Sequence, residues 1–413
     1  MGSLYPLNKT DIRAPSYFPT MVGLGRLLRA ITTKSPLSLT SILLAGCLFI
    51  VLVPTTVSAH STTAAGVSRW HGLLVLFVGV AIAGAGVLAK RYERLTATTS
   101  LSVVFTGIVV GVIGAVLFDG LSPDPTYLAT SIPFSRAWYP LIGVTVGLST
   151  VVASFLIGWL RWPTRPRYMV LGMLAGGWIM YPDVVPGFAS KNPLGYALVL
   201  GTPLFVGYVL WTDTRHVFRT VLSNTVPRRF GSGIATVTGF FFLSITGYLS
   251  FFPEEGVPDQ TVVTVLPAKY QLVVWPTLEV LLPEIPFFLA LSIGEIAIVG
   301  TLSVLIGLQA SLIAQKWIVD ESAGFVKNTA NASAIVGSCT CGCCGPLVAK
   351  VIILAAGPSV AAPLYWVFVD TASPLSVVFI VGSMLLFTGS ILHSVAAVGH
   401  ADRSTAIASA QTN

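Results

Sequence analysis

Apolar residues in this chain come in long, nearly uncharged runs instead of short alternating patterns. A run of about 20 helical residues matches the roughly 30 Å hydrocarbon core of a bilayer. A membrane β-barrel would show shorter segments of alternating polarity. The pattern predicts an all-α fold, a polytopic transmembrane helical bundle of about ten spans. The predicted spans are 37–57, 71–89, 101–118, 139–160, 169–185, 195–212, 232–252, 286–315, 332–356 and 376–396.

The composition agrees with a membrane protein. Hydrophobic residues make up 54% of the chain and charged residues 9%. A soluble core cannot use that much apolar surface, so a soluble multidomain protein is excluded. The net charge is +7, but the basic residues are dispersed at span ends and form no dense run, so no nucleic-acid partner is expected.

Lysine and arginine are distributed unequally between the two sides of the predicted bundle. Because cytoplasmic loops carry an excess of these residues, the richer side is predicted to be cytoplasmic. This places the chain in the cell membrane as a multi-pass protein with a cytoplasmic C-terminus. The richer side holds Lys90, Arg91, Arg94, Arg161, Arg165, Arg167, Arg215, Arg219, Arg228, Arg229, Lys316, Lys327 and Arg403, and the poorer side holds Arg69, Arg136, Lys191 and Lys269.

This topology divides the chain into four parts. Residues 1–36 form a cytoplasmic N-terminal segment, 37–59 a first span or cleavable signal, 60–397 the multi-span membrane domain, and 398–413 a short cytoplasmic tail. An outer-face loop lies near 253–285. Its apolar stretch Tyr270–Trp275 predicts a segment at the membrane interface, with a re-entrant hairpin as the alternative.

The first apolar run ends at Val57-Ser58-Ala59, a small-residue pattern suited to signal peptidase. Cleavage there would leave His60 as the first residue, and its amine and imidazole suit a transition metal such as copper. This context resembles the copper proteins whose processed N-terminal histidine forms a histidine brace, with His71 as a second donor. The alternative is a retained helix with two ordinary interfacial histidines.

The most concentrated chemistry is a group of thiols within the predicted span 332–356. Cys339, Cys341, Cys343 and Cys344 fall within six residues. On a helix, residues three or four apart share a face, so Cys339 pairs with Cys343 and Cys341 with Cys344. Thiolates select soft ions such as Cu(I) and Zn²⁺. The pattern favours binding or transport of a soft transition metal.

One short stretch of this span resembles a known family. Cys343-Cys344-Gly345-Pro346-Leu347 is similar to the first helix of bacterial mercury transport proteins, where a vicinal cysteine pair precedes a Pro-Leu step. The likeness covers about ten residues, and the chain has no counterpart of that family's further cysteine pairs. The resemblance implies handling of copper, zinc or mercury ions.

Other functions remain open. Cys341 and Cys344 form a C-x-x-C dithiol, as in membrane thiol–disulfide redox proteins. Cysteine also packs well between helices as a small apolar residue. A third possibility is a non-catalytic, permease-like subunit, because the chain has no P-loop and would rely on a separate energising or metal-delivery protein. The overall pattern is more typical of a transporter or binding protein than of an enzyme.

Two charged residues within predicted spans are candidates for a transport pathway. Glu295 falls about nine residues into the predicted span 286–315, where an acid costs about 2.5–3.5 kcal/mol. A protonated, hydrogen-bonded glutamic acid is the alternative. Lys350 follows the cysteines on the same predicted helix, where its long side chain can reach the interface or pair with an acid.

Overall fold

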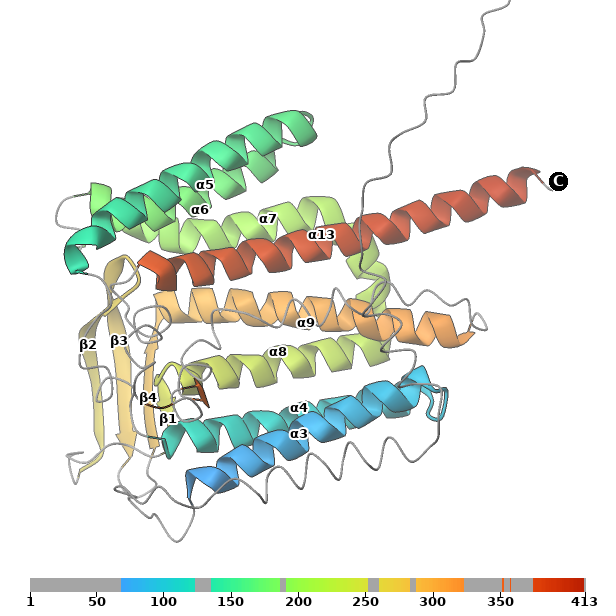
Figure 1. The fold of residues 1–413 in the computed structure, drawn as a ribbon, viewed down its shortest axis with the longest axis horizontal. Coiled ribbons are helices and arrows are strands. Elements are labelled where there is room, and N and C mark those ends of the chain that lie inside the picture. The colour runs from blue at the N-terminus through green and yellow to red at the C-terminus, as the bar shows by residue number, and fades with distance from the viewer. Residues whose placement is uncertain are drawn as a thin grey trace, which may run out of the picture. The chain divides into compact units, whose positions relative to one another are not determined.

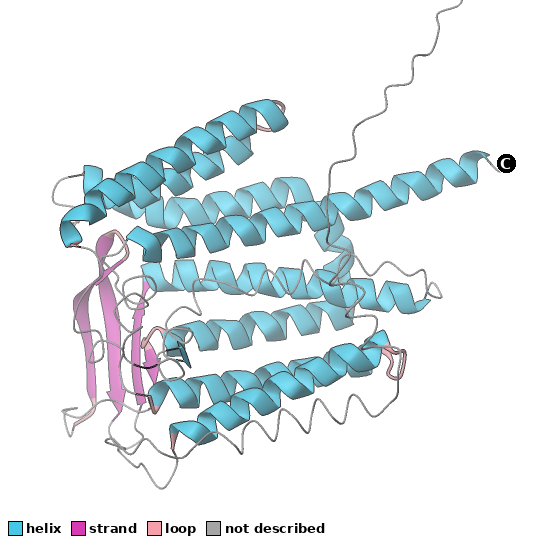
Figure 2. Ribbon diagram, in the orientation of Figure 1, coloured by secondary structure: helices cyan, strands magenta, loops and turns pink. Residues whose placement is uncertain are grey.

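The computed structural model describes the greater part of the chain (Figure 1). All described residues belong to the compact unit Ser61–Asn413, and the other unit, Met1–His60, lies outside them. Long helices dominate, and a small antiparallel sheet crosses one end of the helical bundle (Figure 2). The described ranges are 68–122, 135–185, 191–251, 260–282, 287–322, 351–352, 357 and 374–411.

Successive helices from α3 to α9 alternate in direction. Those with odd labels run away from the sheet and those with even labels run toward it, while α13 again runs away from it (Figure 1). The one described 3₁₀ turn, Arg136–Trp138, leads into α5. The helices are α3 Arg69–Arg91, α4 Ala97–Gly120, α5 Tyr139–Arg161, α6 Pro166–Val184, α7 Pro193–Ser223, α8 Thr225–Ile245, α9 Ile293–Ser322 and α13 Pro374–Gln411.

Within the described residues, six helices are long and apolar enough to cross a membrane. They are α3, α4, α5, α7, α9 and α13. This confirms a mostly helical, membrane-type bundle but does not support the predicted count of about ten spans. The predicted spans 169–185 and 232–252 are helical as α6 and α8 but do not meet the same measure of length and hydropathy. The predicted spans 37–57 and 332–356 lie largely or wholly outside the described residues.

The helices form three closely packed antiparallel pairs, α3 with α4, α5 with α6, and α8 with α9. Each pair is joined by two glycines whose backbones touch. A Cβ on Gly147 would lie 2.8 Å from the carbonyl oxygen of Gly176, and one on Gly176 would lie 2.6 Å from that of Gly147. Gly231 and Gly307 stand in the same reciprocal relation in the α8–α9 pair. Small residues that allow backbones to approach closely are typical of helix packing in membranes.

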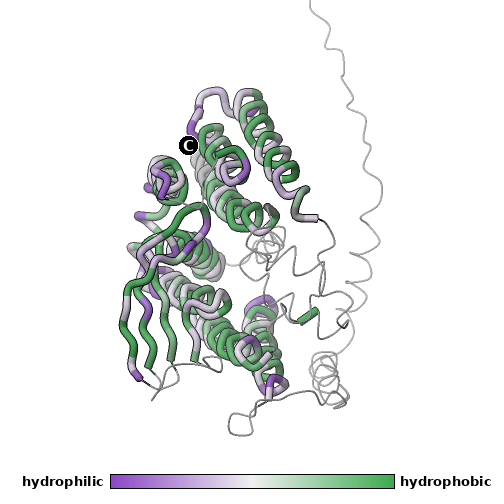
Figure 3. The backbone as a smooth tube through the Cα atoms, turned by 90° about the vertical axis from the view of Figure 1, so that its left-hand side faces the viewer, coloured by the Kyte–Doolittle hydropathy of each residue, from purple (hydrophilic) through white to green (hydrophobic). Residues whose placement is uncertain are grey.

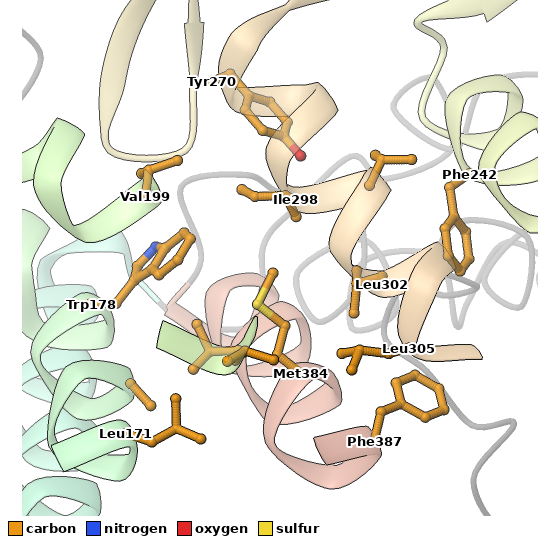
Figure 4. Close-up of a cluster of buried hydrophobic side chains, with 14 of the residues drawn as sticks. Leu171, Trp178, Val199, Phe242, Tyr270, Ile298, Leu302, Leu305, Met384 and Phe387 are labelled. Carbon is orange, nitrogen blue, oxygen red and sulfur yellow. The ribbon is translucent and has the colours of Figure 1, made fainter. Parts of the chain in front are cut away.

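Apolar side chains occupy both the inside and the outside of the bundle. The core lies among α6, α7, α9 and α13, where Trp178, Val199, Leu302 and Met384 are buried (Figure 4). Hydrophobic residues also continue around the helices (Figure 3), and Leu160 is 82% exposed. A bundle that is apolar on its outer faces matches a lipid environment.

The sheet has the strand order β1-β4-β3-β2, and all its pairs are antiparallel. A two-residue loop, Gln271-Leu272, joins β2 to β3, and Gln271 has a φ of 54°. Pro267 of the edge strand β2 lies opposite Pro276, which is beyond the part of β3 that pairs with β4. Proline is tolerated at such places because its missing N–H breaks no ladder bond. The strands are β1 Leu249–Ser250, β2 Val262–Tyr270, β3 Val273–Leu282 and β4 Phe287–Ser292.

The sheet corrects one sequence prediction. The predicted span 286–315 begins too early, because residues 287–292 form β4 and helix α9 starts at Ile293. Strand and helix share the same hydropathy here, so an apolar run alone does not locate the junction. The segment Tyr270–Trp275 is the end of β2, a tight turn and the start of β3, and its place at the membrane interface stays a prediction.

Candidate functional site

The described residues include two of the predicted site residues, His71 and Glu295. His60, the four cysteines of the 339–344 cluster and Lys350 lie outside the described residues. Within the part of the chain that the structure describes, no three His, Cys, Asp or Glu side chains come together in a group able to hold a metal ion. The most concentrated chemistry among the described residues surrounds Glu295, where the sheet meets the helices.

Glu295 caps the start of helix α9. One oxygen of its carboxylate accepts a hydrogen bond from the backbone N–H of Ser292 at 2.9 Å, and the Ser292 hydroxyl oxygen lies 3.3 Å from the backbone nitrogen of Glu295. This reciprocal arrangement is a capping box, which satisfies backbone donors at a helix start. Glu295 is therefore in the first turn of α9 and not nine residues into a span, although its side chain is only 1% exposed.

Aromatic residues of the sheet surround this cap. The indole of Trp275 packs on Gly294, where a Cβ would lie 2.6 Å from the ring. The ring also meets Tyr196 of α7 edge-on, at 4.7 Å between centroids, and its N–H donates to the carbonyl oxygen of Tyr270 at 3.2 Å. The Tyr196 hydroxyl donates to the carbonyl oxygen of Val274. These contacts fasten the β2–β3 hairpin to α7 and α9.

Tyr248 completes the cluster from the chain that leads into β1. Its ring meets that of Tyr270 edge-on at 5.6 Å, and its backbone carbonyl accepts the N–H of Ala290. Burial raises the pKa of the Tyr248 hydroxyl, and the negative charge of Glu295 raises it further. The cluster thus combines a buried carboxyl group with a phenol that stays neutral, and the carboxyl group is the member able to exchange a proton or attract a cation.

Helices α6 and α7 also contain buried polar atoms. The indole nitrogen of Trp178 and the hydroxyls of Tyr181 and Thr202 are buried without a hydrogen-bond partner within the described part of the chain. The Tyr181 hydroxyl lies close to Gly195, at the start of α7. Because buried polar atoms are normally hydrogen-bonded, each of these three atoms could bind ordered water or a polar ligand.

His71 also has a local structural role. It is the third residue of α3, and its Nδ1 lies 2.9 Å from the Ser68 hydroxyl and 3.1 Å from the Ser68 backbone nitrogen. The side chain reaches back over the helix start in the manner of a capping box. These contacts occupy Nδ1 and leave Nε2 as the ring nitrogen for any metal.

Sequence reasoning missed an ionic cluster at the opposite end of the bundle. Asp213 of α7 pairs with Arg167 and accepts a hydrogen bond from the Tyr168 hydroxyl at 2.8 Å. Arg165 lies 3.8 Å from the same carboxylate and donates to the Tyr168 hydroxyl at 3.1 Å. Asp213 stands beside basic residues in the sequence, but its partners lie 45 and 46 positions away, so no local pattern reveals the contact.

Gln309 of α9 is another polar side chain whose partner is far away in the sequence. Its side-chain amide donates to the carbonyl oxygen of Phe387 at 3.2 Å and so joins α9 to α13.

Comparisons with protein-family models, with curated proteins and with solved structures find no match for this chain.

Proposed function

We propose that this chain is a multi-pass protein of the cell membrane that binds or transports a soft transition metal through Cys339, Cys341, Cys343 and Cys344. Copper, zinc and mercury ions are the candidates, because thiolates prefer soft ions over hard ones. Four thiols within six residues of a predicted apolar helix are the observation that carries this proposal. A coordinated thiol loses its proton, so the cluster would bind a cation even inside the bilayer.

The direction of two described helices supports a membrane crossing for the cysteine segment. Helices α9 and α13 pack together and both run away from the sheet (Figure 1). The chain that leaves α9 at Ser322 must therefore return to the sheet end before α13 begins at Pro374. The apolar run 332–356, which contains the cysteines, is long enough to make that return across the bilayer.

The full proposal retains about ten crossings. Helices α6 and α8 pack along α5 and α9 through paired glycine backbones, which favours a common depth for each pair. The first predicted span, 37–57, is the tenth, unless it is a signal that is cleaved. Most of the described basic residues lie at the helix ends opposite the sheet, which supports a cytoplasmic C-terminus.

Two further groups of residues belong to the proposal. Glu295 and Lys350 would line the ion path, and Glu295, although it caps α9, is a buried acid with one oxygen committed to Ser292. His60 and His71 would form a second metal site if the chain is cleaved before His60. The chain has no P-loop, so energy or metal would come from a separate protein.

Metal analysis of anaerobically purified protein tests the proposal. The wild type should retain copper or zinc after dialysis, or bind added mercury ion, and the Cys343→Ala/Cys344→Ala double variant should lose that metal. Cys47→Ala is the matched control, because Cys47 lies outside the cluster, and it should bind metal like the wild type. Equal metal content in the wild type and the double variant would remove the basis of the proposal.

The spacing of Cys341 and Cys344 supports a second candidate, a membrane thiol–disulfide redox protein. Two electrons and two protons would leave the dithiol for an external disulfide or quinone as the cysteines form a disulfide. Thiol trapping followed by mass spectrometry should then find both cysteines cycling between reduced and oxidised forms. Cysteines that remain reduced under oxidising and reducing conditions would exclude this candidate.

A further inference from the structure

The turn between α5 and α6 gathers positive charge around one carboxylate. The segment Arg161–Tyr168 contains three arginines and no acidic residue. Asp213 of α7 pairs with Arg167, accepts a hydrogen bond from Tyr168 and lies 3.8 Å from Arg165. A single carboxylate neutralises one guanidinium, so the turn keeps a surplus of positive charge.

This surplus is accessible from outside the bundle. The side chain of Arg165 is 52% exposed, and Arg161 at the end of α5 is exposed as well. Arg165 uses one nitrogen for Tyr168, which leaves most of its five N–H donors free to meet an acceptor. Arginine presents these donors in a planar fork that fits the oxygens of a phosphate group.

Large apolar side chains lie directly beside these arginines. In the last turn of α5, Trp159 is 64% exposed and Leu160 is 82% exposed, and the neighbouring Trp162 is 42% exposed. The ring of Trp162 meets that of Tyr168 edge-on at 5.6 Å. Exposed tryptophans between an apolar helix face and a charged turn are typical of the boundary between acyl chains and headgroups.

We propose that the α5–α6 turn binds the headgroup of an acidic phospholipid. Arg161 and Arg165 bind the phosphate, while Trp159 and Leu160 contact the upper part of the acyl chains. Arg167 stays paired with Asp213 and holds the turn against α7. The turn lies at the end of the bundle opposite the sheet (Figure 1), and this proposal does not depend on the metal proposal.

Native mass spectrometry of the purified full chain in detergent tests this site. The protein is titrated with phosphatidylglycerol or phosphatidylcholine, and bound lipid is counted. We expect the wild type to prefer phosphatidylglycerol and Arg165→Gln to bind it about fivefold more weakly, since a basic residue near the surface contributes about 1 kcal/mol to anionic-lipid binding. Arg165→Gln should still melt like the wild type, because Arg167 keeps the pair with Asp213.

Lys191→Gln serves as the matched control, because Lys191 is an exposed basic residue just before α7, which begins at the sheet end of the bundle (Figure 1). It should bind phosphatidylglycerol like the wild type. Equal binding of phosphatidylglycerol by the wild type and Arg165→Gln would overturn the proposal, and so would equal binding of the two lipids by the wild type. Displacement of the lipid by the same concentration of inorganic phosphate would overturn the assignment to a lipid.

Discussion

Gly79 of α3 and Gly107 of α4 lie backbone against backbone. A Cβ on Gly79 would stand 2.7 Å from the carbonyl oxygen of Gly107, and a Cβ on Gly107 would stand 2.8 Å from that of Gly79. Real side chains do not approach a backbone atom this closely, so any larger residue forces the two helices apart. The α5–α6 and α8–α9 pairs show the same reciprocal contact, so close packing of two glycine backbones recurs in this bundle.

The first prediction follows from that contact. Gly79→Ala should destabilise the protein by about 1–3 kcal/mol, the usual cost of overpacking. Gly84→Ala on the same helix is the control, because no described atom lies within 4 Å of a Cβ at that position. Thermal unfolding in detergent micelles measures both variants. If the two variants unfold at the same temperature, the close α3–α4 contact is wrong.

The second prediction separates two roles of Glu295. Glutamine also completes a capping box, so Glu295→Gln should keep the stability of the wild type, whereas Glu295→Ala should lose about 0.5–2 kcal/mol. If Glu295 also serves the ion path, Glu295→Gln should stop metal uptake into proteoliposomes while the protein stays folded. A folded Glu295→Gln variant with full metal uptake would show that Glu295 caps helix α9 and does not serve the ion path.

The third prediction concerns the ionic cluster at the other end of the bundle. Asp213→Asn removes the charge that faces Arg167 and should cost about 1.5–3 kcal/mol, the range for hydrogen bonds to charged groups. Tyr168→Phe removes a neutral hydroxyl that donates to Asp213 and accepts from the exposed Arg165, but it leaves the Arg167–Asp213 pair in place, so it should cost less than Asp213→Asn. Chemical unfolding of both variants measures the two losses in the free energy of unfolding. A larger loss for Tyr168→Phe than for Asp213→Asn would contradict the charge pairing.

The fourth prediction concerns alkaline pH. Burial and the charge of Glu295 raise the pKa of Tyr248 above the ordinary tyrosine value of about 10, so the folded state favours the protonated phenol. This contribution to stability is complete below pH 10 and declines as the pH rises above it. The free energy of unfolding of the wild type should therefore fall between pH 9 and 11 more steeply than that of Tyr248→Phe. Parallel slopes would show that Tyr248 does not contribute.

Hydropathy predicted the helical bundle well because lipid-facing helices need continuous apolar runs. The predicted spans 71–89, 101–118 and 139–160 fall within α3, α4 and α5. The same measure failed at the sheet, where strand β4 and helix α9 form one unbroken apolar run. The period-two burial of Val273, Trp275 and Thr277 reveals strand β3, but Pro276 between them argues locally against a strand.

The site was predictable only where its signal is local. Ser292 and Glu295 have the S-x-x-E spacing of a capping box, so the sequence does contain the sign of a helix start at Ile293. The contacts of Trp275 with Gly294 and Tyr196 depend instead on how the hairpin folds over α7 and α9. Asp213 likewise finds its partners only through the packing of α6 on α7.

X-ray absorption spectroscopy of the zinc-loaded, anaerobically purified protein tests the central claim most directly. The account predicts a first shell dominated by sulfur at about 2.3 Å, the usual zinc–thiolate distance. The same shell should be lost in the Cys343→Ala/Cys344→Ala variant and kept in Cys47→Ala. A first shell of oxygen and nitrogen alone, unchanged between the wild type and the double variant, would contradict a thiolate metal site.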